Sequence, residues 1–254
     1  MTEARFRPRP GAAPLVSMLL AQAALEFRLT VRNGEQVVLT IIIPALLLLI
    51  FGSGHLASEG APDLDFLVPG VMALAILSTA FTGQAIATGF DRRAGVLKRL
   101  SASPLPRAGL IAAKAIAVLG IELMQLLLIA GIGHLQGWRP AFSALDAVLM
   151  VVLGTAALSG LGLLMAGRLR AEATLAAANF VFLMLLAGGG MLLPLSKFPS
   201  QAGRFLSFLP TAALSDGLRA AFSASSPFPA PAVGILLVWA VVAITAAALT
   251  FRWE

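Results

Sequence analysis

Six long apolar runs constrain the fold of this chain more than any other feature. They cover residues 36–54, 66–88, 108–132, 145–167, 173–195 and 231–251. Each is close to the length of about 20 residues that a helix needs to cross a membrane. Charged residues make up 12% of the chain and hydrophobic residues 59%, and this charged share is about half that of a soluble domain. The sequence therefore predicts an all-α polytopic membrane protein with six transmembrane helices.

The part before the first apolar run predicts two further segments. Residues 1–13 are basic and rich in proline, which is typical of a disordered cytoplasmic tail. Residues 14–35 have the spacing of a helix, but their second half is too charged to cross a bilayer. An N-terminal interfacial helix that lies in the membrane plane fits them better than a helix on the soluble side. Residues 14–254 then form a single transmembrane domain.

The distribution of basic residues predicts the orientation in the membrane. Six spans place both termini on one side. The segments on that side contain 13 Lys and Arg residues, whereas the loops on the opposite side contain 4. Basic residues accumulate on the cytoplasmic side of membrane proteins. We therefore expect cytoplasmic N- and C-termini in a plasma membrane.

The stretch 91–107 holds the densest cluster of charge and lies between the second and third runs. Its apolar residues recur every three to four positions, so a short helix over about 91–101 would place them on one face. Gly95 loosens the start of this helix and Pro104 stops it. A short amphipathic cytoplasmic helix between two spans indicates a docking site, although a basic loop that only fixes the topology is the simpler alternative.

The segment 196–230 is the second informative region. It alternates short apolar pieces with prolines, and neither piece is long enough to cross a membrane. We expect two short helices, roughly 199–209 and 212–222, that enter the membrane from the outer face. A plain external loop is the alternative, but the phenylalanines of this segment argue against it.

Polar residues inside the spans are candidates for function, because they are costly in a membrane. Glu122 lies near the middle of the third span and Gln125 lies one turn further on, while Asn179 lies in the fifth. We expect each of them to make a hydrogen bond between helices. Glu122 could alternatively carry a proton or contact a ligand. Lys114 is too far from Glu122 along the helix for a direct pair, so we expect it to snorkel to the interface.

Motifs for catalysis and metal binding are absent from the sequence. The chain has no cysteine, no H-E-x-x-H zinc motif and no serine site of an intramembrane protease. It also lacks the G-x-x-x-x-G-K-[ST] loop that holds ATP phosphates. We therefore expect no enzyme activity, no bound cofactor and no metal in this chain.

The order of these segments resembles an ABC-2 type transporter permease, closest to the daunorubicin-resistance-like drug exporters. The family's first cytoplasmic loop resembles G-x-L-x-x-L-x-x-x-P. Its outer segment resembles Gly-x-x-x-Pro-x-x-x-x-Pro with a later Leu-Pro, and the family more often has Glu at the position of Asp91. The matching or adjacent residues of the two regions are Asp91, Arg92, Arg93, Gly95, Leu97, Lys98, Arg99, Leu100 and Pro104, and Gly190, Pro194, Pro199, Leu209 and Pro210.

The resemblance implies the transport subunit of an ATP-hydrolysing exporter in a prokaryote. A separate P-loop ATPase, which would hold ATP and Mg²⁺, would dock on the 91–101 coupling helix. Leu97 and Leu100 would fill a groove of the ATPase, while the basic residues around them would meet its acids or lipid headgroups. A second copy or a paralogue would complete the path, which would carry a hydrophobic drug, a lipid or a lipid-linked glycan, and the outer helices would gate it.

Two other functions fit the residues. A proton-coupled secondary transporter would use Glu122, and a membrane scaffold would transport nothing. Nucleic acid is not an expected partner, because the basic residues lie between apolar runs instead of covering a folded surface.

Overall fold

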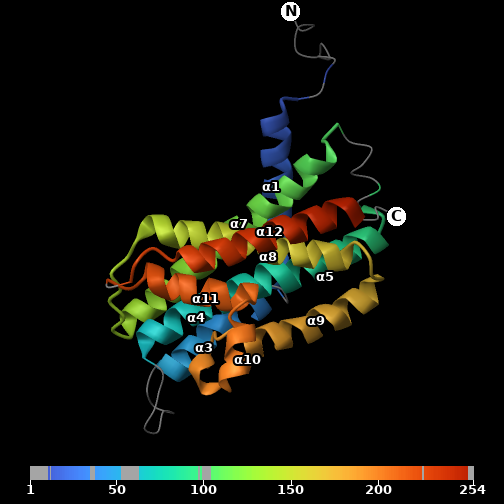
Figure 1. Cartoon of the computed structure of the whole chain (residues 1–254). Coiled ribbons are helices and arrows are strands. Elements are labelled where there is room, and N and C mark those ends of the chain that lie inside the picture. Colours follow the sequence, from blue (N-terminus) through green and yellow to red (C-terminus); the bar gives the residue numbers. More distant parts are fainter. Residues whose placement is uncertain are drawn as a thin grey trace, which may run out of the picture.

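The structure is a computed structural model that describes residues 11, 13–34, 38–52, 63–96, 98, 104–224 and 226–250. All regular structure within these residues is helical. Among these residues, five helices are long and apolar enough to cross a membrane. Most of them lie side by side in one bundle (Figure 1). The chain is an all-α polytopic membrane protein, as the sequence predicted.

The second span is the centre of the bundle. It is one continuous helix, Leu64–Arg93, made of α4 (Leu64–Ile76), the π-helical segment η3 (Leu77–Gly83) and α5 (Gln84–Arg93). Its most apolar window is 78% buried within the chain, whereas those of the fifth and sixth spans are 28% buried. The helix continues five residues past the predicted end at 88, because nothing between 88 and 93 breaks it.

Helix α8 (Ala144–Ala166) packs on the second span and on the last helix, α12 (Ala230–Thr250). Small residues permit this approach: a Cβ atom added at Gly160 would lie 2.9 Å from the Cβ of Ala243 and 3.0 Å from the backbone nitrogen of Ile244. Close packing of membrane helices relies on such small residues. The third span, α7 (Arg107–Leu135), runs obliquely across this group (Figure 1).

The first membrane segment differs from the predicted straight span over 36–54. Its described part consists of the π-helical segment η2 (Val38–Ile42) and the short helix α3 (Ile43–Gly52). Pro44 lies at the second position of α3. Proline cannot donate the hydrogen bond of a regular α-helix, so the turn before it widens. Residues 36, 37, 53 and 54 lie outside the described part of the chain.

The fifth span also ends earlier than predicted. Helix α9 (Ala171–Gly188) stops seven residues before the expected end at 195. Its last residue is Gly188, two further glycines follow, and Gly190 has a φ of +62°. Glycine adopts this left-handed conformation without a steric cost, which is a common way to end a helix. The glycines at the end of this apolar run therefore terminate the helix.

Short helices follow at the end of the bundle that the sequence predicts to face outward, close to the predicted positions. They are the 3₁₀ turn η4 (Leu195–Lys197), α10 (Ser200–Leu206) and α11 (Pro210–Ala221). Helices α10 and α11 differ in how far they are buried within the chain. Helix α11 buries one face against α8, α4 and α12, whereas α10 has no buried residue and Phe205 is 78% exposed. Only α11 is thus part of the bundle core.

Helix α1 (Leu15–Arg32) projects across the direction of the bundle helices and packs on α7 (Figure 1). Its exposed side chains include large apolar residues, among them Leu15, Val16, Leu20, Leu25 and Leu29. This orientation is what a helix in the membrane plane requires. The predicted tail over 1–13 lies outside the described residues except for 11 and 13.

Candidate functional site

The first three residues of the coupling helix predicted over 91–101 belong instead to the second span. Asp91, Arg92 and Arg93 form the last turn of α5, and a turn at Ala94 and Gly95 follows. Gly95 has a φ of +69°, so it ends the long helix instead of starting the next one. The chain is helical again at residues 96 and 98. The described helical residues after the second span therefore resume at residue 96, one turn after its end.

Asp91 is bound within the chain by a buried lysine. The Lys114 ammonium lies 2.8 Å from Asp91 Oδ2 and 3.2 Å from Glu26. Only 7% of the Lys114 side chain is exposed. The expectation that Lys114 snorkels to the interface is wrong, because two carboxylates surround its ammonium inside the protein. This ion triad joins α1, α5 and α7.

The next two residues bind the turn before α9 and the first turn of α9. Arg92 donates a hydrogen bond to the backbone carbonyl of Leu169, and Arg93 pairs with Glu172. Both sides of the Arg93–Glu172 pair are exposed. The sequence predicted that these arginines meet an ATPase or lipid headgroups, whereas each has a partner within the chain. We call residues Glu26, Asp91, Arg92, Arg93, Lys114 and Glu172 the inner junction.

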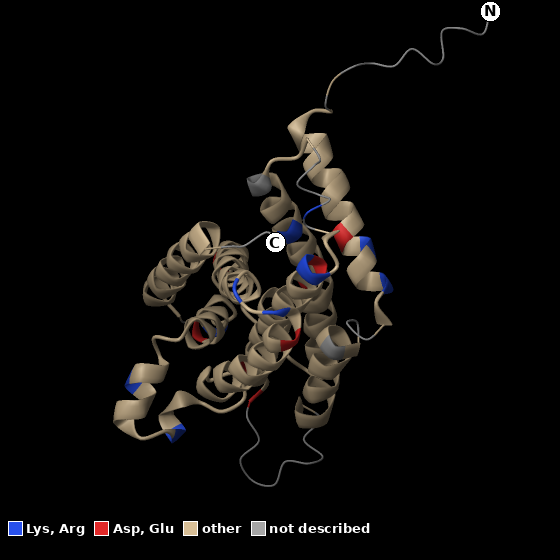
Figure 2. Ribbon diagram, turned by 90° about the vertical axis from the view of Figure 1, so that its right-hand side faces the viewer, with Lys and Arg blue, Asp and Glu red and all other residues tan. Residues whose placement is uncertain are grey.

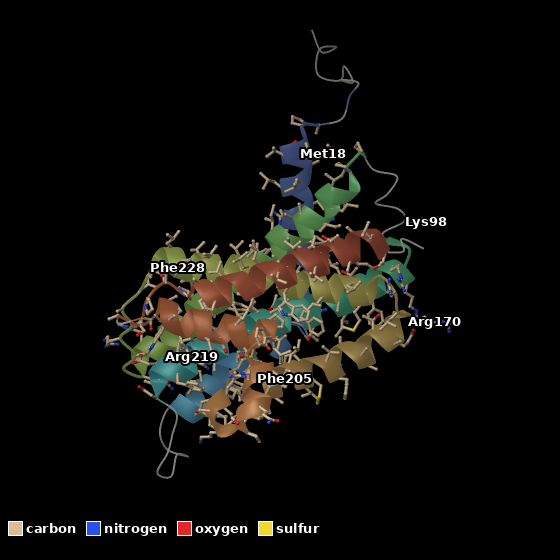
Figure 3. The ribbon with its side chains drawn as sticks, in the orientation of Figure 1. Met18, Lys98, Arg170, Phe205, Arg219 and Phe228 are labelled. Carbon is tan, nitrogen blue, oxygen red and sulfur yellow. The ribbon has the colours of Figure 1, made fainter. Side chains whose placement is uncertain are left out.

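The remaining coupling residues are only partly described. Leu97, Arg99 and Leu100 lie outside the described residues. Lys98 is exposed and lies at the same end of the bundle as Arg170 (Figure 3). Figure 2 looks toward this end and shows basic and acidic residues close together between α1 and the bundle. Pro104 is exposed, and α7 begins three residues after it.

The predicted outer residues mark the boundaries of the outer helices. Gly190 follows the end of α9, and Pro194 and Pro199 directly precede η4 and α10. Leu209 precedes α11, and Pro210 is its first residue. Proline suits the first turn of a helix, whose N–H groups have no partner within the helix. These residues thus set where each outer helix starts.

Three polar side chains on one face of α11 bind the C-terminal end of α9, and the sequence analysis did not predict these contacts. The Thr211 hydroxyl donates to the Leu185 carbonyl at 3.2 Å, and the Ser215 hydroxyl donates to the Gly189 carbonyl at 2.9 Å. Arg219 Nη2 donates to the carbonyls of Gly190 and Met191 at 2.7 and 3.1 Å. These carbonyls lie in and just beyond the last turn of α9, where a helix cannot satisfy its own acceptors. The signal in the sequence was the spacing of four residues between the three donors.

Arg219 also binds the outer end of the second span. Its guanidinium lies 3.7 Å from the centre of the Phe66 ring, and Nε donates to the Phe66 carbonyl at 3.3 Å. Nη1 pairs with Asp216 at 2.9 Å. Burial raises the pKa of the Asp216 carboxyl, and the positive charge of Arg219 opposes this shift. We call Thr211, Ser215, Arg219 and their partners the outer junction.

The predicted polar residues of the spans have different surroundings. Glu122 is fully buried and accepts a hydrogen bond from the Thr155 hydroxyl, while its other oxygen has no partner among the described residues. Gln125 is buried and binds Thr79 and the backbone of Thr40. Asn179 is exposed on α9. The structure therefore joins Gln125 to two other helices and leaves Asn179 on the surface of the single chain.

Comparison with known families identifies the chain. A sequence profile of ABC-2 type transporters matches residues 19–223. This chain belongs to the ABC-2 type transporter family. The match runs from α1 through α11, so it includes both junctions. No curated protein matches the chain at a significant level.

The ABC-2 family consists of membrane-spanning transport subunits. Two hollows lie at the outer end of this permease. One, of about 670 Å³, is lined by residues of the outer junction together with Asp63, Asp65 and Arg139. The other, of about 730 Å³, is apolar and lies along the end of α7. Among the described residues, no group of three His, Asp or Glu side chains is placed to hold a metal ion.

Proposed function

We propose that this chain is the permease subunit of an ATP-driven exporter that moves a hydrophobic or amphipathic substrate out of the cytoplasm. Membership of the ABC-2 family supports transport. The sequence contains no P-loop, so a separate ATPase would bind ATP and Mg²⁺. The single observation that carries the proposal is the inner junction, which connects the start of the coupling segment to three other parts of the chain.

The inner junction supports a way to transmit force from an ATPase. The coupling segment follows Arg93 by one turn, so a push on it acts on the end of the second span. Asp91 passes this force to α7 and α1 through Lys114, and Arg92 and Arg93 pass it to the start of α9. Leu97 and Leu100 would bind the ATPase, and Lys98 and Arg99 would meet its acids.

The charge asymmetry supports the orientation of this assembly. Lys98 and Arg170 lie at one end of the bundle, and Arg219 lies toward the other (Figure 3). Basic residues concentrate on the cytoplasmic side of a membrane, so the inner junction would face the cytoplasm of a prokaryotic cell. Both termini would be cytoplasmic, and residues 14–254 would act as one transmembrane domain.

A second copy, or a paralogous permease, would complete the transport path. Asn179 is exposed on α9 and no hydrogen bond of its side chain is found among the described residues. An amide that faces lipid without a partner is costly, so α9 is better placed against protein or substrate. The second span is too buried within its own chain to supply most of such a surface. The path would therefore be lined mainly by α9, and η4, α10 and α11 would gate its outer end.

Proton-coupled transport has less support. A proton path needs a series of groups that exchange protons, whereas the one hydrogen-bond partner found for Glu122 is Thr155, a hydroxyl that does not titrate. A scaffold function differs from both transport mechanisms because it predicts neither ATPase activity nor substrate movement.

Purification from the native organism tests the proposal. We expect a soluble P-loop ATPase to co-purify with the detergent-solubilised chain in near-equal amount and to hydrolyse ATP. The variant Leu97→Ala/Leu100→Ala should lose most of this ATPase. The matched control is Leu135→Ala/Leu145→Ala, because these leucines are 87% and 77% exposed at the other end of the bundle, and it should retain the partner.

Two results would contradict the proposal. Unchanged co-purification of the Leu97→Ala/Leu100→Ala variant would exclude these leucines as the docking site. Failure to recover an ATPase under gentle conditions, together with transport that persists without ATP and is abolished by Glu122→Gln, would favour a proton-coupled transporter instead.

A further inference from the structure

Helix α10 and the preceding turn η4 lie at the edge of the bundle, beside the end of α9 (Figure 1). Two contacts fix α10 in this position, although it has no buried residue. The first is with the end of α9: a Cβ atom added at Gly188 would lie 2.8 Å from Leu206 and 3.0 Å from Leu209. The second is with α12, where Trp239 Nε1 donates to the Phe208 carbonyl at 2.9 Å. The rest of α10 is uncovered within the described part of the chain.

The uncovered face combines aromatic and basic side chains. Phe205 is 78% exposed and Phe208 is 61% exposed, and Arg204 is exposed as well. Arg204 and Phe205 precede Phe208 by four and three residues, which are the spacings of neighbours on one helix face. Lys197 of η4 is also exposed, and η4 packs on α10. Apolar and basic side chains combined in this way are typical of helices at a membrane surface.

The two cations of this face have no anionic partner within the described residues. The side chains of Lys197 and Arg204 take part in none of the ion pairs found there. The sequence contains no acidic residue between Glu172 and Asp216. Glu172 pairs with the inner junction at the opposite end of α9, and Asp216 pairs with Arg219. Both positive charges are therefore available to an anion from outside the chain.

The length of α9 places this face at a membrane surface. Helix α9 has 18 residues and extends about 27 Å, which is close to the thickness of about 30 Å of the hydrocarbon core of a bilayer. Arg170 is exposed and directly precedes α9, so it marks one surface of the membrane. Helix α10 packs on the opposite end of α9. Its cations therefore lie at the level of the headgroups of the other leaflet, where phenyl rings can reach the acyl chains.

We propose that η4 and α10 bind the headgroup of an anionic phospholipid in the leaflet that the sequence predicts to face outward. Lys197 and Arg204 donate to oxygens of the lipid phosphate, and Phe205 and Phe208 lie among its acyl chains. A second copy of the chain does not fit this face, because it would oppose the same positive charges without an acid beside them. The bound lipid keeps α10 against the end of α9. This inference concerns the chain and its membrane and does not depend on an ATPase or on the direction of transport.

The tryptophan that binds α10 provides a local test. The sequence holds three tryptophans, so the full chain with Trp138→Phe/Trp253→Phe keeps only Trp239. It is reconstituted in vesicles that mix phosphatidylglycerol and phosphatidylcholine, one of which carries bromine on its acyl chains and quenches nearby tryptophan. Quenching at several lipid ratios gives the preference of the site for one headgroup. We expect a preference of at least about tenfold for phosphatidylglycerol, because each basic residue near an anionic headgroup contributes about fivefold.

Two matched variants assign this preference to the proposed site. Lys197→Gln/Arg204→Gln should abolish it, and both side chains are exposed, so the fold should persist. The control is Arg168→Gln/Arg170→Gln, which removes two exposed cations at the other end of α9 and should keep the full preference of Trp239 quenching for phosphatidylglycerol.

Each other outcome overturns the proposal. Equal quenching by the two lipids, or a preference that survives Lys197→Gln/Arg204→Gln, would show that these cations do not recognise a headgroup. Weak quenching by both lipids would show that protein covers this face. Loss of the preference on addition of inorganic phosphate at constant ionic strength would indicate a site for a free anion. If Trp138→Phe/Trp253→Phe does not fold, a fluorescent label on Gln201→Cys replaces Trp239, because Gln201 is exposed on α10 and the chain has no cysteine.

Discussion

The inner and outer junctions hold the two ends of the bundle in different ways. The inner junction consists mainly of pairs between side chains of opposite charge, with Lys114 between Glu26 and Asp91 and with Arg93 on Glu172, while Arg92 donates to the Leu169 carbonyl. The outer junction consists mainly of side chains that donate to backbone carbonyls at the end of α9. Charge pairs can exchange partners when helices move, whereas carbonyls at a helix end need the same donors in the same place.

This difference suggests different mechanical roles. The inner junction joins α1, α5, α7 and the start of α9, and its strength depends on charge and exposure. The outer junction fixes where α9 ends and keeps α11 on the bundle. We therefore expect the inner end to change its pairing during transport and the outer end to move as a unit. The following variants test this comparison, from the largest expected effect to the smallest.

Lys114→Met should have the largest effect. It leaves the carboxylates of Glu26 and Asp91 facing each other without their cation, and removing one partner of a buried ion group costs about 3–5 kcal/mol of unfolding free energy. Denaturant titration in mixed micelles measures the loss. The variant Glu26→Gln/Asp91→Asn/Lys114→Met should recover most of it, because no uncompensated charge remains. Equal losses in the two variants would show that charge is not what holds the inner junction.

Arg219→Lys should cost about 2 kcal/mol of unfolding free energy. Lysine keeps the positive charge beside Asp216 but cannot reach the carbonyls of Gly190 and Met191 together. The same titration measures the loss. Arg204→Lys is the matched control on α10, where the side chain is exposed, and it should leave stability unchanged. If Arg219→Lys left the unfolding free energy unchanged, positive charge alone would be sufficient at the outer junction, as we expect at the inner junction.

Gly95→Ala should destabilise the chain by about 1 kcal/mol, because its φ of +69° disfavours a side chain. No atom lies within 4 Å of the added Cβ, so the cost comes from the backbone alone. Gly131→Ala is the control: its surroundings are equally open but it lies inside α7, and it should stabilise the chain by up to about 1 kcal/mol. Thermal unfolding measures the change in stability of both variants. Changes of the same sign would contradict the turn assigned at Gly95.

Arg93→Ala should have the smallest effect on stability, about 0.5 kcal/mol or less. The two side chains of the Arg93–Glu172 pair are 62% and 63% exposed, and such pairs contribute little. High salt should remove most of the difference in stability between this variant and the wild-type chain, because exposed charges are screened. Thermal unfolding at low and high salt measures it. A large effect that salt does not reduce would assign this pair to the buried part of the inner junction.

The sequence predicted the helices well where a long apolar run decided the structure. The second, third, fourth and sixth spans lie close to their predicted ranges, and so do the two outer helices. The errors fall where one residue changes the backbone. Pro44 interrupts the first segment, Gly190 follows an early end of the fifth, and Gly95 ends the second span, whereas it was expected to loosen the start of the coupling helix.

Long-range polar contacts could not be predicted from the sequence. Lys114 pairs with a residue 88 positions earlier, and Arg219 binds a carbonyl 153 positions earlier. No local pattern states which helices will be neighbours, so the partners of single polar residues stay undetermined. The sequence did indicate that Glu122 and Gln125 are polar residues within a span, because isolated polar residues stand out in an apolar run. The residues that would contact an ATPase remain a prediction.

The unbroken path of the second span from Leu64 to Arg93 has a geometric consequence. A helix of this length extends about 45 Å, so it can act as a lever arm. If its inner end tilted by about 10° around a fixed outer end, the inner end would travel roughly 8 Å. The outer junction fixes one end of this helix through the contacts of Arg219 with Phe66, and the residues of the inner junction bind the other end. A small angular change of this helix would thus be enough to displace the start of α9 by more than a helical turn.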